Sequence, residues 1–409
     1  MMRRGFALIL FCALAFAAPV AQARTVLRVT VPEYSMKTRP YLVDLKAAFE
    51  KANPDIEVDW EIVPWDGLRQ KLTTEIAGGN NTDLVIMATT WIPDLVSQDL
   101  LAPLNDLLPK ALTDRFLPNF LQRQAIGGKL YGLPEAASVR ALFYNKDIFS
   151  RAGIAGPPKT WDELIADARR VKALNEPNVF GYGMQGKGAE TDVYLYYLMW
   201  SLGGEILDAN NHSALGSLAS LQALTTYKSM LDEGLTEPGI TAYIRDDVQV
   251  LFKRGQVAMM ISAPFLATQI RTEAPNLKYG IAPVPSATTS VTYGVTDCIS
   301  VFANSQHKAE AARLLEFMYR PEWKLRQDRD EGFLPVTLDE AAMPEFADDP
   351  DLGIFMAMLP KARFLPLVPG WPGAALATVN ALQKVYLGQM SPADGLRQGA
   401  HDVDAALHQ

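Results

Sequence analysis

The stretch Asp83-Leu-Val-Ile-Met-Ala88, followed by Thr89-Thr90-Trp91, indicates the fold class of the chain. Its continuous apolar run predicts a short strand that is buried on both faces of a sheet. The residues before it alternate between two kinds of element, with strands predicted over 27–32 and 56–63 and helices over 41–51 and 67–77. This strand and helix order predicts a largely parallel sheet covered by helices.

A second region with the same alternation follows. Thr160-Trp-Asp-Glu163 has the T-x-x-E pattern of a helix start and predicts a helix through Leu174. Further elements are predicted as helices over 194–202 and 218–231, a strand over 257–262, and a terminal helix that starts at Ser391-Pro-Ala-Asp394. Because 409 residues exceed what one hydrophobic core usually serves, we expect two α/β lobes.

The N-terminus has the pattern of a secretory signal peptide. Arg3 and Arg4 precede an uncharged apolar run over residues 5–20, which closes on Ala21-Gln-Ala23. This predicts a signal peptide over 1–23, cleavage after Ala23 and a periplasmic location. The alternative, a membrane anchor, is disfavoured because the run is short and Pro19 interrupts its end. Only Cys298 would remain after cleavage, so no intramolecular disulfide is expected.

Charge and motif content exclude several classes of function. The chain carries 38 basic and 46 acidic residues, a net charge of −8, which argues against nucleic acid or anionic lipid as a partner. No G-x-S-x-G motif occurs. The four histidines, His212, His307, His401 and His408, show neither H-x-x-x-H nor H-x-H spacing. We therefore expect no cofactor and no dedicated metal site.

Six segments, in order along the chain, resemble the extracellular solute-binding proteins of ABC importers, the family of maltose-binding protein. They are Asp83–Ala88 with Trp91, Leu142–Phe149, Pro158–Leu164, Leu198–Gly204, Phe252–Met259 and Gly332–Pro335.

The resemblance implies a fold and its division. The fold is α/β, a two-lobe periplasmic binding protein fold (type II), in which each lobe is a mixed, mainly parallel sheet flanked by helices. Three hinge crossings between the lobes are expected near residues 135–140, 292–297 and 335–342. The N-terminal lobe would comprise residues 24–138 plus 295–338, and the C-terminal lobe residues 139–294 plus 339–409.

The resemblance also implies a function without catalysis. The protein would be the periplasmic substrate-binding component of an ABC importer, which captures a sugar or sugar derivative in the interlobe cleft by hinge closure. Its expected partners are a small carbohydrate-like ligand and the membrane permease subunits, with no nucleic acid, and we expect a monomer.

Candidate ligand-binding residues follow from two requirements of sugars, aromatic faces for the ring and planar polar groups for the hydroxyls. Ligands on such sheets bind beyond the carboxyl ends of the strands, which directs attention to Glu33-Tyr34, Trp65-Asp66 and Thr89-Thr90-Trp91. With the positions that the resemblance implies, the candidates are Glu33, Tyr34, Thr90, Trp91, Ser138, Arg140, Asp192, Tyr194, Phe265, Asp297, Arg363 and Trp371.

Trp371 and Phe265 fall where the family places stacking aromatics, and each has core packing as its alternative. We expect Trp371 to be exposed in the open cleft and dispensable for the fold. Thr90 and Trp91 stand where maltose-binding protein uses a charged pair, so the ligand is expected to differ from maltose.

Three alternatives to a neutral sugar as the ligand stay open. Arg140 and Arg363 could fork onto an anionic group, which would suit an acidic sugar derivative or a glycerophosphate-type ligand, and a polyol is also compatible with the site. A different class, an exported glycoside hydrolase, would need a catalytic carboxylate pair, and nothing in the sequence nominates one.

Overall fold

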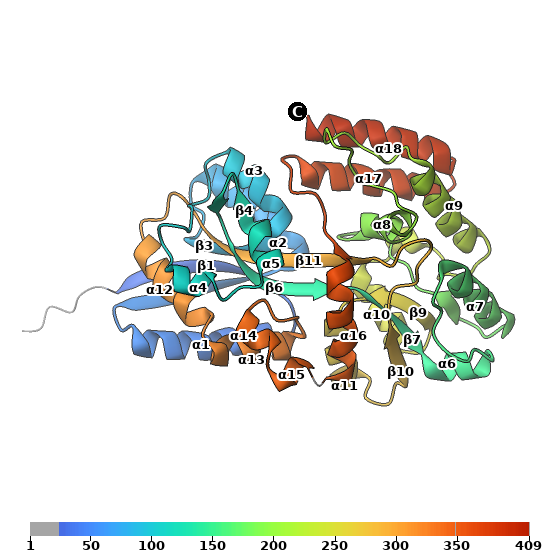
Figure 1. Ribbon diagram of the computed structural model, residues 1–409, viewed down its shortest axis with the longest axis horizontal. Coiled ribbons are helices and arrows are strands. Elements are labelled where there is room, and N and C mark those ends of the chain that lie inside the picture. Colours follow the sequence, from blue (N-terminus) through green and yellow to red (C-terminus); the bar gives the residue numbers. More distant parts are fainter. Residues whose placement is uncertain (1–23, 348, 409) are drawn as a thin grey trace, which may run out of the picture.

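The computed structural model describes residues 24–347 and 349–408, so the predicted signal peptide lies outside the described residues. Figure 1 shows two lobes side by side, each built on one sheet with helices packed around it. None of the helices in the described part of the chain combines the length and apolar character that a membrane crossing needs.

The first lobe contains a mixed sheet in the order β2, β1, β3, β11, with β6 and β12 paired to β11. β1 runs parallel to β2 and β3, whereas β11 runs antiparallel to β3 and β6. Leu84, Val85, Ile86 and Met87 of β3 are all buried, as expected for a strand covered on both faces. The strands are β1 (Thr25–Glu33), β2 (Ile56–Pro64), β3 (Leu84–Ala88), β6 (Leu133–Val139), β11 (Thr292–Val301) and β12 (Ala362–Arg363).

Helices and short elements surround this sheet. They are α1 (Thr38–Ala52), α2 (Trp65–Gly78), η1 (Thr89–Trp91), α3 (Ile92–Ser97), α4 (Lys110–Thr113), α5 (Pro118–Leu121), η2 (Gln122–Gln124), β4 (Ala125–Ile126), β5 (Lys129–Leu130), α12 (Lys308–Met318), α13 (Pro321–Glu331), α14 (Leu338–Ala341) and α15 (Pro344–Ala347). The predicted β-α-β-α-β order of the first 65 described residues is confirmed, with element ends shifted by a few residues.

The second lobe contains a sheet in the order β10, β7, β9, β8. Only the pair of β8 and β9 is parallel, while β7 runs antiparallel to β9 and to β10. The expectation of a mainly parallel sheet is therefore wrong for this lobe. Its strands are β7 (Ala141–Asn145), β8 (Phe180–Tyr182), β9 (Val257–Ser262) and β10 (Tyr279–Ala282). β7 runs antiparallel to its neighbours because it enters directly from the first lobe, without a helical crossover that would align it with them.

The helices of the second lobe include those predicted over 160–174, 194–202 and 218–231 and the terminal helix predicted from Ser391. They are α6 (Lys146–Arg151), α7 (Trp161–Ala173), α8 (Thr191–Ser201), α9 (Leu218–Asp232), η3 (Ile240–Ala242), α10 (Arg245–Lys253), α11 (Phe265–Glu273), α16 (Pro350–Met358), η4 (Leu359–Lys361), α17 (Trp371–Tyr386) and α18 (Pro392–Leu407). The two predicted caps form: the hydroxyl of Thr160 accepts the N–H of Glu163 at 3.1 Å, and that of Ser391 accepts the N–H of Asp394 at 3.1 Å.

Two crossings between the lobes lie next to each other. β6 ends at Val139 and β7 begins at Ala141, so the chain changes lobe at Arg140. The N–H of Arg140 donates to the carbonyl of Tyr293 at 3.2 Å, and the hydroxyl of Thr292 donates to the carbonyl of Arg140 at 2.6 Å. These bonds tie the first crossing to the start of β11.

The third crossing falls later than the predicted segment 335–342. The N–H of Leu338 donates to the carbonyl of Arg115 at 2.7 Å, and the guanidinium of Arg115 pairs with Asp339 at 2.6 Å. Both contacts hold α14 on the first lobe. The chain leaves this lobe between α15 and α16, which lies against β6, β7 and β10 in the middle of Figure 1.

Candidate functional site

A cluster of three side chains from the first lobe lies where β6 and β11 approach the second lobe. The hydroxyl oxygen of Tyr34 is 2.9 Å from Oδ2 of Asp297 and 3.3 Å from Oε2 of Glu135. Burial raises the pKa of Asp297 to about 8 and also raises the pKa of Glu135. A β-bulge between Asp297 and Cys298 changes the direction of successive side chains there. The raised pKa favours the neutral carboxylic acid form of Asp297, which can both donate and accept hydrogen bonds.

Aromatic rings form a row beside this cluster. The ring of Tyr34 stacks on Trp65 at a centroid distance of 5.9 Å, and Trp65 stacks on Trp91 at 6.3 Å. The edge of Phe333 meets the ring of Tyr34 at 4.9 Å. Tyr34, Trp65 and Trp91 are each half-buried, so the row keeps accessible surface. We call these three residues the aromatic row.

The charged groups next to β7 are paired with one another. Nη1 of Arg140 donates to the hydroxyl of Ser138 at 2.8 Å, and its Nη2 forms an ion pair with Glu190. A second guanidinium, that of Arg245, lies 3.8 Å from the same carboxylate. Burial opposes ionisation of Glu190, but the two guanidinium groups outweigh it and lower the pKa of this carboxyl. The guanidinium of Arg140 also lies 5.2 Å from the ring centroid of Tyr293.

Asp192 and Tyr194 belong to α8, a helix in which every residue is buried. Burial raises the pKa of Asp192 to about 7, and its Oδ2 has no hydrogen-bond partner among the described residues. Tyr194 meets the edge of Tyr197 at 5.9 Å and is 4% exposed. Tyr194 therefore packs in the core of the second lobe, whereas Asp192 keeps an unused acceptor.

Phe265 opens α11 and is half-buried. The guanidinium of Arg245 lies 4.9 Å from its ring centroid. Its backbone approaches Gly332 of the first lobe so closely that a Cβ at this glycine would come within 2.9 Å of the Cα of Phe265. Gly332 also has a φ of 75°, which favours glycine. Phe265 therefore lies where the two lobes meet.

Trp371 is 2% exposed, so the expectation of an exposed stacking platform is wrong in this structure. The tryptophan opens α17, and this helix lies against η1 of the first lobe. The N–H of Gly370, in front of it, donates to Oδ1 of Asp94 in α3 at 2.6 Å. The first turn of α17 is thus buried by contact with the opposite lobe, which sequence periodicity does not reveal.

The remaining candidates, Glu33, Arg363 and Thr90, lie at separate places in the structure. Glu33 is exposed at the end of β1. The guanidinium of Arg363 pairs with Glu205 and lies 5.2 Å from the ring centroid of Trp200, so its charge is compensated by a carboxylate of the second lobe. Thr90 lines a cavity of about 40 Å³ between η1, β11 and the residues that follow β12, together with Tyr293 and others. Its full lining is Ala88, Thr89, Thr90, Arg123, Tyr293, Gly294, Val295, Thr296, Phe364 and Leu365.

The model of the bacterial extracellular solute-binding protein family matches residues 35–325. The chain belongs to this family.

Relatives and solved structures of solute-binding proteins agree with this membership. A binding protein of Brucella abortus (strain 2308) is 50% identical over 382 residues, which cover 93% of each chain. The maltotriose-binding protein of Pyrococcus abyssi is 26% identical over 325 residues, or 77% of this chain and 68% of that protein. An ABC transporter solute-binding protein of Thermotoga lettingae, solved with α-D-tagatose, has a TM-score of 0.85 at 23% identity and covers 94% of this chain and 100% of that one. The chain is a solute-binding protein of the ABC-transporter class with the type II two-lobe fold.

Three residues of this solute-binding protein that contact the candidates were not nominated from the sequence. Trp65 directly follows β2; its place at the carboxyl end of a predicted strand directed attention to it, but it was not included among the candidates. Glu135 lies on β6, the strand that pairs with the strand of Asp297, and no local sequence motif marks it as a site residue. Glu190 adopts a φ of 67°, unusual for a residue with a side chain, and reaches Arg140 only through the tertiary fold.

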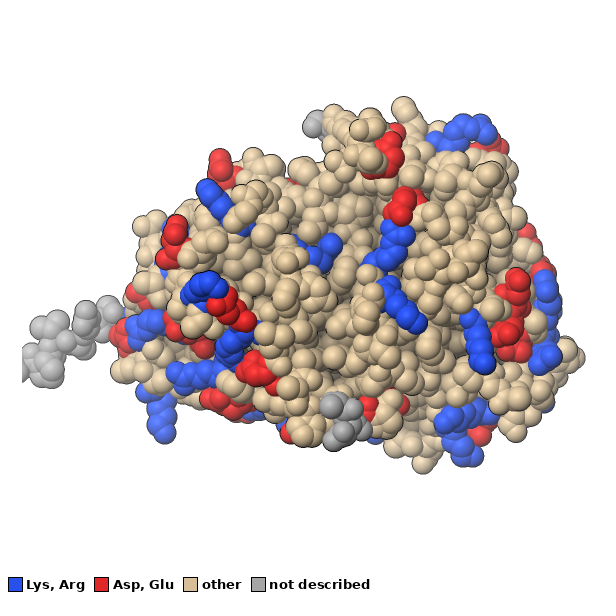
Figure 2. Space-filling model, in the orientation of Figure 1, with Lys and Arg blue, Asp and Glu red and all other residues tan. Residues whose placement is uncertain are grey.

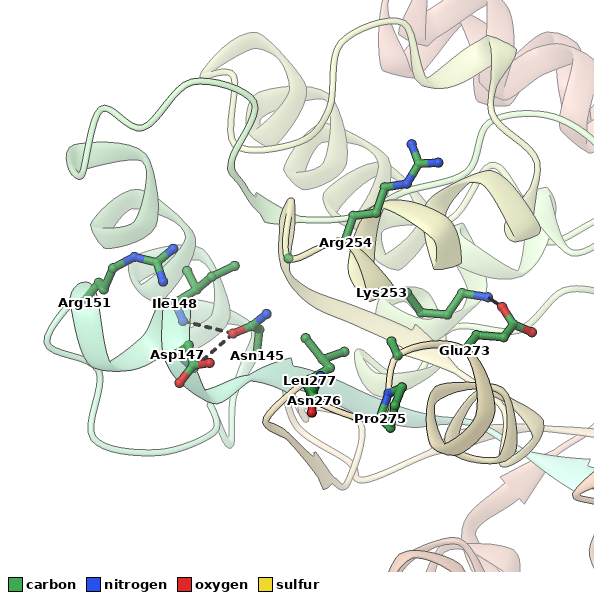
Figure 3. Close-up of a pocket in the computed structure, with 12 residues that line it drawn as sticks. Asn145, Asp147, Ile148, Arg151, Lys253, Arg254, Glu273, Pro275, Asn276 and Leu277 are labelled. Carbon is green, nitrogen blue, oxygen red and sulfur yellow. Dashed lines mark hydrogen bonds and ion pairs between the residues drawn. The ribbon is translucent and has the colours of Figure 1, made fainter.

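A large surface recess of the solute-binding protein lies away from these residues. It has a volume of about 550 Å³ and lies on the outer side of the second lobe, around α6, β7 and the end of α11. Figure 3 shows two sets of bonds among its residues: Oδ1 of Asn145 accepts the N–H groups of Asp147 and Ile148, and Lys253 pairs with Glu273 at 2.5 Å. Figure 2 shows basic and acidic side chains interspersed over one face, without a continuous basic patch.

Proposed function

We propose that this protein captures an uncharged polyhydroxylated ligand of the sugar class between its lobes and delivers it to the permease of an ABC importer. The observation that carries the proposal is the aromatic row beside the cluster of Tyr34, Glu135 and Asp297. Half-buried aromatic rings offer a surface for the apolar face of a sugar ring, and adjacent carboxyl groups can bind its hydroxyls. The relatives named above that bind maltotriose and α-D-tagatose support this class of ligand.

The charge state of the site favours a neutral ligand over an anionic one. Burial raises the pKa of Asp297 and so favours its carboxylic acid form, which can donate to one hydroxyl and accept from another. Arg140 is committed to Glu190, and Arg363 to Glu205. An acidic sugar derivative or a glycerophosphate-type ligand that used Arg140 or Arg363 would have to displace the carboxylate paired with it. The alternative of an anionic ligand has no comparable support.

Opening and closing of the lobes is part of the proposal. The lobes meet through the bond from Gly370 to Asp94 and through a second bond from Arg123 to the carbonyl of Leu365 at 2.7 Å. The 40 Å³ cavity beside Arg123 and Leu365 is far below the several hundred Å³ that ligand pockets usually have. A ligand therefore enters when the lobes part, and its differential affinity for the closed form drives closure.

The location and partners extend the family membership. We propose that residues 1–23 direct export to the periplasm, that the protein acts there as a monomer, and that its macromolecular partner is the permease. We also propose that the ligand leaves unchanged, in contrast to the alternative of a glycoside hydrolase.

A screen of neutral saccharides, polyols, sugar acids and glycerophosphate tests the ligand class. A ligand that binds only the native state raises the melting temperature, and chromatography of the same samples detects turnover. We expect stabilisation by a neutral saccharide or polyol and no product. Stabilisation by the anionic compounds alone, or formation of a hydrolysis product, would contradict the proposal.

Substitution then tests the aromatic row. Trp65→Ala should weaken binding of the identified ligand by about 1–3 kcal/mol, the range found when an aromatic anchor is truncated. Calorimetry measures this change. The matched control is Trp323→Ala, a half-buried tryptophan of α13 that packs on Tyr41 and Phe317. The control should keep wild-type affinity. Equal affinity of both variants would remove the aromatic row from the site.

A further inference from the structure

Two of the four histidines of the chain meet at one point of the second lobe, although 196 positions separate them in the sequence. The rings of His212 and His408 have a centroid distance of 4.7 Å. Nδ1 of His212 lies 3.7 Å from Oδ1 of Asp404. One ligand atom from each of these three residues lies within 4.8 Å of the others. The cluster lies at the C-terminal end of α18, beside the C-terminus marked in Figure 1.

We infer that His212, Asp404 and His408 form a binding site for a divalent transition-metal ion of the zinc class. Imidazole nitrogen and carboxylate oxygen are ligands that zinc prefers, and three protein ligands with one open position are a common zinc arrangement. Ligand atoms about 2.0 Å from a tetrahedral zinc ion lie about 3.3 Å from one another. The separation of 3.7 Å between His212 and Asp404 is already close to this value. Both histidines are exposed, so a change of rotamer can close the remaining gap.

The fold holds the ligands in place before an ion arrives. Asp404 and His408 are four residues apart at the end of α18, so they lie on the same side of the helix axis. His212 lies in a turn in which the carboxylate of Asp208 accepts the N–H groups of Asn210 at 2.8 Å and of His212 at 2.9 Å. Such bonds fix the backbone from which the imidazole of His212 projects.

A further bond orients the carboxylate itself. Oδ1 of Asp404 accepts the N–H of Ser213 at 2.6 Å, which joins the helix to the turn. Outer hydrogen bonds of this kind orient metal ligands and raise affinity. The sequence search missed the site because it relied on local His spacing, whereas tertiary packing of α18 assembles these ligands. No residue of the site belongs to the aromatic row, so the inference does not depend on the proposed ligand.

Calorimetry with zinc chloride tests the site on protein that carries no polyhistidine tag. We expect one zinc ion per chain. His212→Ala and His408→Ala should each lower the affinity for zinc by at least about tenfold, because each removes one metal-binding side chain. Asp404→Asn should weaken it as well, while its amide oxygen can still accept the N–H of Ser213. The matched control is His401→Ala, an exposed histidine on the same helix, which should bind zinc like the wild type.

Spectroscopy with cobalt(II) adds a readout that does not depend on stability. Tetrahedral coordination should give intense visible absorption in the wild type and in His401→Ala, and this absorption should be lost in His408→Ala. Absence of zinc binding by the wild type would overturn the inference. So would unchanged zinc affinity in both His212→Ala and His408→Ala, or an equal loss in the His401→Ala control.

Discussion

The two sides of the interlobe site differ in how their polar and aromatic groups are stabilised. On the second-lobe side, Arg140 is paired with Glu190 and Trp371 is 2% exposed. On the first-lobe side, Asp297 keeps an Oδ1 without a partner among the described residues, and Trp65 is half-buried. Apart from the unpartnered Oδ2 of Asp192, the second-lobe side therefore mainly stabilises the protein, while the first-lobe side keeps accessible aromatic surface and hydrogen-bonding capacity for a ligand.

The largest effect should come from breaking the ion pair on the second-lobe side. Arg140→Met leaves Glu190 buried without its main partner and should lower the free energy of unfolding by about 3–5 kcal/mol. Denaturant unfolding measures this. The double variant Arg140→Met/Glu190→Gln should recover much of the loss, because no unpaired charge remains. A single variant as stable as the wild type would show that the pair contributes little.

Trp371→Ala should lower the free energy of unfolding by about 3–5 kcal/mol, because it empties a buried site. Trp65→Ala is the matched comparison and should cost clearly less stability, since that ring is half-buried. Thermal and denaturant unfolding of both variants compare the two sides directly. The contrast between the sides disappears if the two substitutions destabilise the protein equally.

Asp297 on the first-lobe side should make stability depend on pH. Its pKa is about 8 in the folded protein and about 4 in an unfolded chain, so the folded state binds more protons between these values. The carboxyl therefore lowers the free energy of unfolding as pH rises from about 4 to about 8. Glu135 and Asp192, whose pKa values are also raised, contribute in the same direction.

Asp297→Asn should remove its part of this slope and be more stable than the wild type at pH 8 by on the order of 1–3 kcal/mol. Denaturant unfolding at pH 5 and pH 8 measures the slope. The exposed Asp59→Asn serves as the control and should leave it unchanged. If the free energy of unfolding of Asp297→Asn changes with pH as much as that of the wild type, other groups cause the pH dependence.

The smallest effect is expected at Arg363, whose side chain is 33% exposed and pairs with a Glu205 that is 57% exposed. Surface ion pairs contribute about 0–1 kcal/mol, so Arg363→Ala should change stability by no more than that. Affinity for a neutral ligand should not change in calorimetry. A marked loss of affinity would return Arg363 to the site and reopen the anionic alternative.

Local sequence patterns predicted the elements better than the site. The periodicities of residues 25–88 and the caps at Thr160 and Ser391 depend on neighbours within a few positions, and the structure confirms them. Among the candidates, the structure brings Tyr34 and Asp297 into contact and places Trp91 in the aromatic row.

What the sequence could not predict depends on contacts between distant segments. The burial of Trp371 needs α17 to meet the opposite lobe, and the pairing of Arg140 needs Glu190 in a left-handed conformation. The third crossing was placed too early because the bonds from Leu338 and Asp339 to Arg115 have no local signature. Each of these contacts joins residues at least 50 positions apart, where hydrophobic periodicity carries no information.

β11 provides an axis about which the two lobes can rotate. The strand pairs with β12 over Thr292 and Tyr293 and then continues in the same direction between β3 and β6. An extended strand can change its twist at low cost, but covalent geometry prevents it from lengthening. The lobes are therefore expected to rotate about the axis of β11 rather than slide along it, so that the span from Thr292 to Val301 stays constant while the mouth of the cleft widens.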